Sequence, residues 1–191
     1  MPMCHAGVMH ENPLDTHTWM IGIDSWVIQD GSHPDFGTGQ RAEFALEFAS
    51  RSGLRRLDGS HQVGARWVAG SDYEVTAQVV HDEPNAQVLD FGVLAYHFVG
   101  IEDPEHRPEV GAWVTGVINV AVDPSFYVDE LAKEDGFPAL IYTWTVDEVL
   151  QRTPDEPTGL VKVDRTDAWA DDESPGYVLR CRLEPGAPKS R

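Results

Sequence analysis

The stretch RAEFALEFA, residues 41–49, carries the clearest structural signal in the chain. Apolar side chains stand at every second position and glutamates stand between them, with Ala42, Phe44, Leu46 and Phe48 on one side and Glu43 and Glu47 on the other. Successive side chains of a β-strand point to opposite faces of the sheet. We therefore expect a strand at 41–49 whose apolar face packs against a core.

The same two-residue period returns seven more times along the chain. These further strands are expected at 19–28, 73–81, 87–99, 111–123, 138–146, 160–166 and 177–183. The 21 valines outnumber the 12 leucines and the 6 isoleucines, and β-branched side chains favour strands. About eight short strands separated by glycine, proline and aspartate predict an all-β fold, an antiparallel β-barrel or sandwich. The order of five strands, with a short helix before the last, partly resembles that of an OB-fold.

One short helix is expected at 127–133 (YVDELAK), because the pattern ends at Asp135-Gly136. The polar, aperiodic residues 1–18 predict a flexible N-terminal arm, and residues 185–191 predict a C-terminal tail. Between them, residues 19–184 have the length of a single all-β domain.

The charge balance is strongly acidic, with 32 Asp and Glu against 14 Lys and Arg, a formal net charge of −18. Such a field repels phosphate backbones, so nucleic acid is an improbable partner, whereas a basic protein or a cationic small molecule is attracted. No apolar run approaches the roughly 20 residues of a membrane span. The 2 cysteines do not make a disulfide framework, which favours a cytoplasmic location. The oligomeric state stays open.

The most acidic segment surrounds a tryptophan and is the predicted binding site. In DRTDAWADDE, residues 164–173, carboxylates flank an aromatic ring that could anchor a basic partner, and the site consists of Trp169, Asp167, Asp171, Asp172 and Glu173. The alternative is an acidic loop whose tryptophan packs back onto the barrel.

A second segment offers a metal site as an alternative to a protein without cofactor. His33-Pro34-Asp35 has the His-x-Asp spacing of a two-histidine, one-carboxylate triad for Fe(II). A distal histidine would complete it, and His97 is the candidate, with His81 also on a strand that carries apolar residues. The simpler interpretation is an exposed turn at Pro34, so no cofactor is expected.

No hydrolase elbow, phosphate loop, dinucleotide-binding glycine pattern or zinc-protease motif is present. The sequence thus predicts an acidic cytoplasmic β-barrel binding or accessory protein that sequesters or docks a basic protein or cationic ligand. The alternative is a small β-barrel enzyme with an apolar pocket, either a non-haem Fe(II) oxygenase or a metal-free cyclase or isomerase. A hollow barrel interior lined by His81, His97 or Asn119 would favour catalysis.

Overall fold

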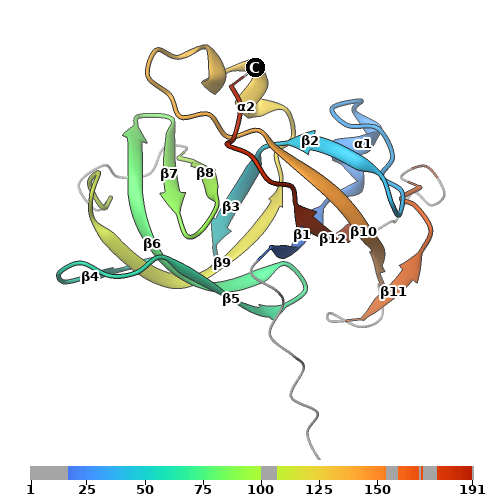
Figure 1. The fold of residues 1–191 in the computed structure, drawn as a ribbon, viewed down its shortest axis with the longest axis horizontal. Coiled ribbons are helices and arrows are strands. Elements are labelled where there is room, and N and C mark those ends of the chain that lie inside the picture. Colours follow the sequence, from blue (N-terminus) through green and yellow to red (C-terminus); the bar gives the residue numbers. More distant parts are fainter. Residues whose placement is uncertain (1–16, 100–106, 154–158, 168, 170–175, 191) are drawn as a thin grey trace, which may run out of the picture.

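A computed structural model of the protein describes residues 17–99, 107–153, 159–167, 169 and 176–190, and the strands within them form one continuous sheet (Figure 1). The all-β fold expected from the sequence is confirmed. The strands are β1 Thr18–Ile23, β2 Arg41–Phe44, β3 Leu46–Ser50, β4 Arg55–Leu57, β5 Gly64–Ala69, β6 Asp72–Glu83, β7 Ala86–Asp90, β8 Leu94–Phe98, β9 Trp113–Val122, β10 Tyr142–Arg152, β11 Leu160–Val163 and β12 Tyr177–Leu183. The helices are α1 Ser25–Gln29 and α2 Phe126–Asp129, with a 3-10 turn, η2, at Leu131–Lys133.

Five strands close a barrel in the ring order β3-β9-β6-β7-β8. Strands β6, β7 and β8 form successive hairpins and β9 returns beside β6, which is a Greek key. Strand β3 closes the ring, antiparallel to β9 and parallel to β8. The structure thus contains a closed five-stranded barrel to which outer strands and a short helix are added. The short helix, expected before the last of the five strands, instead follows all of them.

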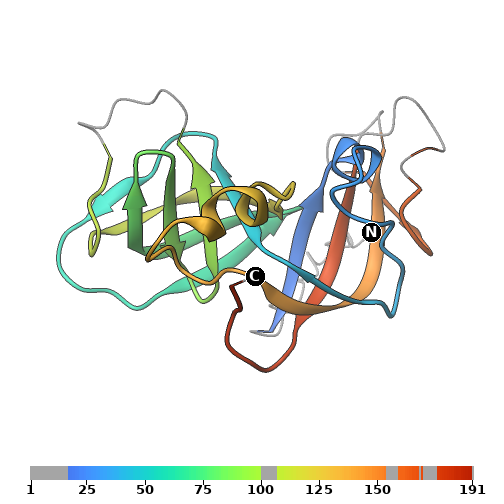
Figure 2. The same ribbon diagram turned by 90° about the horizontal axis from the view of Figure 1, so that it is seen from above.

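The remaining long strands form a curved sheet beside the barrel (Figure 2). Strand β1 pairs with β12, β12 pairs with β10, and β10 pairs along its other edge with β2 and β11. The sheet joins the barrel through a parallel bridge between Gly22 of β1 and Ala121 of β9. The joint is closely packed, because a Cβ on Gly22 would lie 2.8 Å from Ser71 Oγ and 3.0 Å from an Arg152 nitrogen, so these side chains would have to shift. One hydrophobic cluster runs through both halves.

A smaller apolar cluster lies under α2 and η2. Tyr127 and Leu131 bury their side chains against Ala45, Val88 and Tyr96 of the barrel wall. The predicted helix at 127–133 thus exists as two short pieces, α2 and η2, on the outside of the barrel (Figure 1).

Two of the expected strands are each divided in two, which corrects the sequence prediction. Residues 41–44 pair with β10 whereas 46–50 pair with β9, so one alternating run serves both halves of the molecule and changes partner at Ala45. Residues 87–99 form a hairpin, since Gly92 has φ +109 and donates its backbone N–H to Asp90 Oδ1. Phe91 and Val93 flank this turn and are both buried, so the turn resembles a continuous buried strand in sequence.

Other boundaries also differ from the expectation. The strand expected at 19–28 ends at Ile23, because the chain turns into α1 and buries Val27 and Ile28 on one side of it. Strands β4 and β5 were not expected, because their largely exposed residues lack clean apolar alternation. No helix of the described residues is both long and apolar enough to cross a membrane.

Candidate functional site

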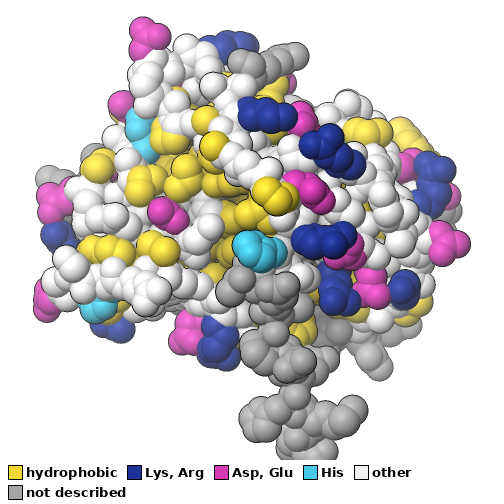
Figure 3. Space-filling view, viewed as in Figure 1, with side chains coloured by type: hydrophobic (Ala, Val, Ile, Leu, Met, Phe, Trp, Pro, Cys, Tyr) yellow, Lys and Arg dark blue, Asp and Glu magenta, His cyan; other side chains and the backbone are white. Residues whose placement is uncertain are grey.

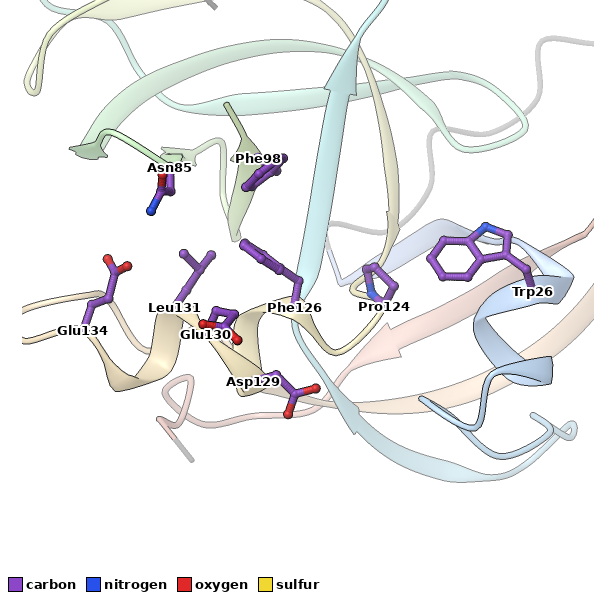
Figure 4. A pocket seen from close by; sticks show the side chains of 9 residues that line it. All are labelled: Trp26, Asn85, Phe98, Pro124, Phe126, Asp129, Glu130, Leu131 and Glu134. Atoms are coloured by element: carbon purple, nitrogen blue, oxygen red, sulfur yellow. The ribbon is translucent and has the colours of Figure 1, made fainter. Parts of the chain in front are cut away.

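A groove of about 690 Å³ lies between the end of β8 and the α2–η2 segment (Figure 4). Its apolar lining comes from Trp26 of α1, Phe98 of β8, Pro124, Phe126 of α2 and Leu131 of η2. Trp26 and Phe98 are each 51% exposed, which is unusual for large aromatic side chains. An exposed aromatic groove of this size has the dimensions of a ligand or peptide site.

The local structure explains why these rings are exposed. In α1 the side chains of Ser25, Val27 and Ile28 are buried, so Trp26 lies on the opposite side of this single helical turn. Phe98 ends β8 on the outer face of the barrel, and its ring meets that of Phe126 edge-on at 4.9 Å. The two aromatic side chains therefore form one wall with a fixed geometry.

The rim of the groove is acidic. Asp129, Glu130 and Glu134 line it, all three are exposed, and none forms an ion pair with a described residue. Lys133 lies between them in sequence, but its ammonium group donates to the backbone carbonyl of Asp129. The rim therefore presents negative charge that no Lys, Arg or His side chain of the described residues pairs with.

Hydrogen bonds to Asp123 connect the segments that form the walls of the groove. Its carboxylate accepts hydrogen bonds from the Tyr96 hydroxyl at 2.5 Å and the Tyr127 backbone N–H at 3.1 Å, which connects β8 to α2. Its carbonyl oxygen accepts one from His33 Nε2 at 2.7 Å, which draws in the loop after α1. Burial raises the pKa of Asp123, and the hydrogen bond from Tyr96 partly opposes this.

A smaller pocket of about 230 Å³ also has Phe98 in its lining. It is lined by Glu47, Phe48, Ala49, His97, Phe98, Asn119 and Ala121. Burial, and then the negative charges of Asp123 and Asp24, raise the pKa of Glu47 from 4.5 to about 7. This Glu47 pocket therefore contains a carboxyl group that exchanges its proton near neutral pH, which is a frequent property of functional sites.

The other polar side chains of the Glu47 pocket are held by defined partners. Asn119 Nδ2 donates to Ser71 Oγ at 2.8 Å and to Asp72 Oδ1 at 2.9 Å. The Ser71 hydroxyl oxygen also lies 3.3 Å from a donor nitrogen of Arg152. His97 Nδ1 lies 3.0 Å from the carbonyl oxygen of Phe48. These bonds fix the orientation of both side chains at the pocket wall.

The acidic loop predicted as the binding site is described only in part. Trp169 is 72% exposed, so it does not pack back onto the barrel. Asp167 shapes the loop: its carboxylate accepts from the Trp169 backbone N–H at 3.3 Å, and its backbone is bonded to the Tyr177 hydroxyl. Residues 171–173, which hold the predicted Asp171, Asp172 and Glu173, lie outside the described residues. This site stays a prediction.

The three residues of the alternative iron site have separate partners. His33 is bonded to the Asp123 carbonyl, and His97 to that of Phe48. Asp35 accepts hydrogen bonds from Thr166 at 2.8 Å and from Arg165 at 3.2 Å. In the part of the chain that the structure describes, no three His, Cys, Asp or Glu side chains are placed to hold a metal ion. The geometry thus gives the iron alternative no support.

Sequence reasoning missed the groove and the role of Glu47. Trp26 lies within the strand expected at 19–28, and Phe98 continues the apolar pattern of the strand expected at 87–99. The sequence therefore gives no sign that either ring is exposed. Glu47 was placed correctly on the charged face of its strand, but the segments that enclose this face are distant in sequence. His97 and Asn119, which the sequence analysis places at the lining of a hollow barrel interior, line the Glu47 pocket instead, outside the barrel core.

Comparison of the chain with protein-family models, with curated proteins and with solved structures finds no match.

Proposed function

We propose that this protein is an acidic binding module that docks a basic, partly apolar segment of a partner protein in the groove between β8 and α2. The observation that carries the proposal is the combination of two half-exposed aromatic rings, Trp26 and Phe98, with a rim of carboxylates. Aromatic side chains in a shaped groove supply binding energy, and rim charges select and steer the partner.

The distribution of charge supports a basic partner at this surface. On the face seen in Figure 3, several Lys and Arg side chains lie over the half formed by β10 and β12, and apolar side chains gather over the barrel half. Many of the arginines are already paired with carboxylates, as Arg182 is with Asp147 at 3.1 Å and Arg165 with Asp35 at 3.2 Å. A basic segment thus approaches the groove without repulsion from a basic cluster.

The location that fits this proposal is the cytoplasm. Cys181 is buried and free, and burial raises the pKa of its thiol, so it behaves as a small apolar side chain of the core. A protein of this kind would sequester or dock its partner rather than transform it.

The test uses short fluorescent peptides of defined pattern, titrated with the full chain and followed by fluorescence anisotropy. We expect saturable binding of a peptide that alternates lysine and leucine. The lysine–glycine peptide has no apolar anchor and the glutamate–leucine peptide has the wrong charge, so both should bind much more weakly. Trp26→Ala should weaken binding of the first peptide by roughly 10- to 100-fold, the range of a buried aromatic anchor.

Two matched pairs of variants make the test specific to the groove. Glu130→Lys reverses a rim charge, and Asp58→Lys makes the same change at an exposed position away from the groove. Trp169→Ala removes the exposed tryptophan of the acidic loop and is compared with Trp26→Ala. If Trp26→Ala and Glu130→Lys bind like the wild type, or if Trp169→Ala alone weakens binding, the groove is not the docking surface.

A further inference from the structure

We propose that the Glu47 pocket is a specific subsite for one cationic side chain, the ammonium of a lysine or the guanidinium of an arginine, from the segment docked in the neighbouring groove. This inference rests on the proposed function and adds to it a recognition element. Phe98 lines both hollows, so a segment lying across its ring can extend one side chain into the pocket. The pocket, at about 230 Å³, has room for several waters of roughly 30 Å³ each and therefore for a side-chain head group.

Asn119 presents only an acceptor to the pocket. Asp72 is a carboxylate that accepts hydrogen bonds, so the amide nitrogen of Asn119 must be the atom that faces it. The second amide hydrogen is donated to Ser71 Oγ. Both hydrogens of the amide are thereby used, and the carbonyl oxygen Oδ1 is the polar atom left for a ligand.

The hydrogen-bonding capacity of His97 is limited in the same way. The carbonyl oxygen of Phe48 can only accept, so Nδ1 of His97 carries the hydrogen in this bond. In the neutral imidazole the other nitrogen, Nε2, then holds a lone pair and accepts. His97 thus adds a second acceptor to the lining of the Glu47 pocket.

Glu47 completes the set with a negative charge when it is ionised. The other lining residues are Phe48, Ala49, Phe98 and Ala121, whose side chains carry no polar hydrogen. The pocket therefore combines an anion, two neutral acceptors and aromatic side chains, and no lining side chain retains a free donor. A ligand with several N–H donors and a positive charge satisfies all of these groups.

The same lining argues against the metal-free enzyme considered from the sequence. Glu47 has the proton affinity of a general base, but proton abstraction next to a carbonyl develops negative charge on oxygen. Such a charge needs hydrogen-bond donors, and the lining side chains offer acceptors instead. Recognition of a cation uses every polar group of the pocket.

The electrostatic surroundings favour this ligand. Burial raises the pKa of Glu47 most, and the charges of Asp123 and Asp24 raise it further, so negative groups already lie near the site. The guanidinium of Arg152 lies 3.6 Å from the Asp24 carboxylate and partly neutralises its charge. The Asp72 carboxylate accepts a hydrogen bond from Asn119. Tyr96 donates to Asp123, and His97 lines the pocket itself. A bound ammonium would stabilise ionised Glu47 and displace its proton to solvent.

The experiment combines a series of peptides with protein variants. In the lysine–leucine peptide each lysine is replaced in turn by acetyl-lysine, which keeps the length and removes the charge, and by arginine. We expect one position at which acetylation weakens binding to the wild type about tenfold and arginine is tolerated. In Glu47→Gln the same acetylation should have no effect, whereas Glu43→Gln, a matched change at an exposed position, should behave like the wild type.

A proton count gives an independent readout. Isothermal titration at pH 7 in buffers of different ionisation enthalpy should show release of roughly half a proton per peptide bound, since Glu47 has a pKa of about 7. The release should disappear in Glu47→Gln, which assigns the released proton to Glu47.

The outcomes distinguish this inference from the function on which it rests. If Trp26→Ala weakens peptide binding but no lysine position is coupled to Glu47, the subsite does not exist and the groove remains the docking surface. If no peptide binds at all, both proposals fall. Circular dichroism of Glu47→Gln checks that a loss of coupling does not come from unfolding.

Discussion

At Glu47 the stability of the fold and the proposed function have opposite requirements, because an ionised carboxylate lowers stability but binds a cation. Its strand places it on the charged face, yet neighbouring segments enclose it next to Asp123 and raise its pKa to about 7. An acid whose pKa is higher in the folded protein than in the unfolded chain destabilises the fold once it ionises. A site that maintains such a group at the expense of stability is more readily explained by ligand binding than by packing.

This gives a prediction for stability. The contribution of Glu47 is fully present below pH 4.5 and is lost as the pH rises through about 7, where the folded protein releases the proton. The free energy of unfolding of the wild type, relative to that of Glu47→Gln, should fall by up to about 3 kcal/mol between pH 4 and pH 8. Urea denaturation at a series of pH values measures this difference. A constant difference over this range would contradict the assignment.

At the scale of single elements, local patterns in the sequence were sufficient for most of the sheet. The alternation at 73–81, 111–123 and 177–183 predicts β6, β9 and β12 in place, because each strand has one face on the core. The divided strands could not be foreseen, since a change of pairing partner at Ala45 leaves the alternation unbroken.

The candidate site was harder to predict than the sheet. The groove is assembled from α1, the end of β8 and α2, which lie far apart along the chain. The sequence draws attention to His97 and Asn119 only as the lining of a hollow barrel interior, whereas both line the Glu47 pocket outside the core. Their actual neighbour, Glu47, depends on the parallel pairing of β3 with β8, which no local pattern encodes.

The joint between the two halves offers a prediction at the element scale. A Cβ on Gly22 would lie 2.8 Å from Ser71 Oγ and 3.0 Å from an Arg152 nitrogen, so Gly22→Ala should shift these side chains and disturb the hydrogen bonds of Ser71 with Asn119 and Arg152. We expect a loss of roughly 1–3 kcal/mol in the free energy of unfolding, the usual cost of overpacking. Chemical denaturation measures it, and Gly64→Ala is the control, because nothing lies within 4 Å of a Cβ at that position. Equal stability of the two variants would show that the joint is not tightly packed.

For the whole molecule, the net charge of −18 acts at a longer range than the groove. A field of this sign raises the rate at which a basic partner meets the protein, and salt screens it over about 8–10 Å at physiological strength. The rings of Trp26 and Phe98 act only after contact, because apolar burial has no long-range component. In the proposed function, charge therefore acts while the partner approaches, and the aromatic rings stabilise the complex after contact.

This separation predicts how the two kinds of variant differ in their kinetics. Glu130→Lys should lower the association rate of the lysine–leucine peptide and flatten its dependence on salt, with a small effect on dissociation. Trp26→Ala should leave the association rate within about threefold and raise the dissociation rate, which carries most of the weakening. Stopped-flow fluorescence at low and high sodium chloride concentrations measures both constants, with Asp58→Lys as the charge control. If both variants changed the same rate constant, charge and aromatic contact would not act at separate stages, and the groove would have to bind by a different route.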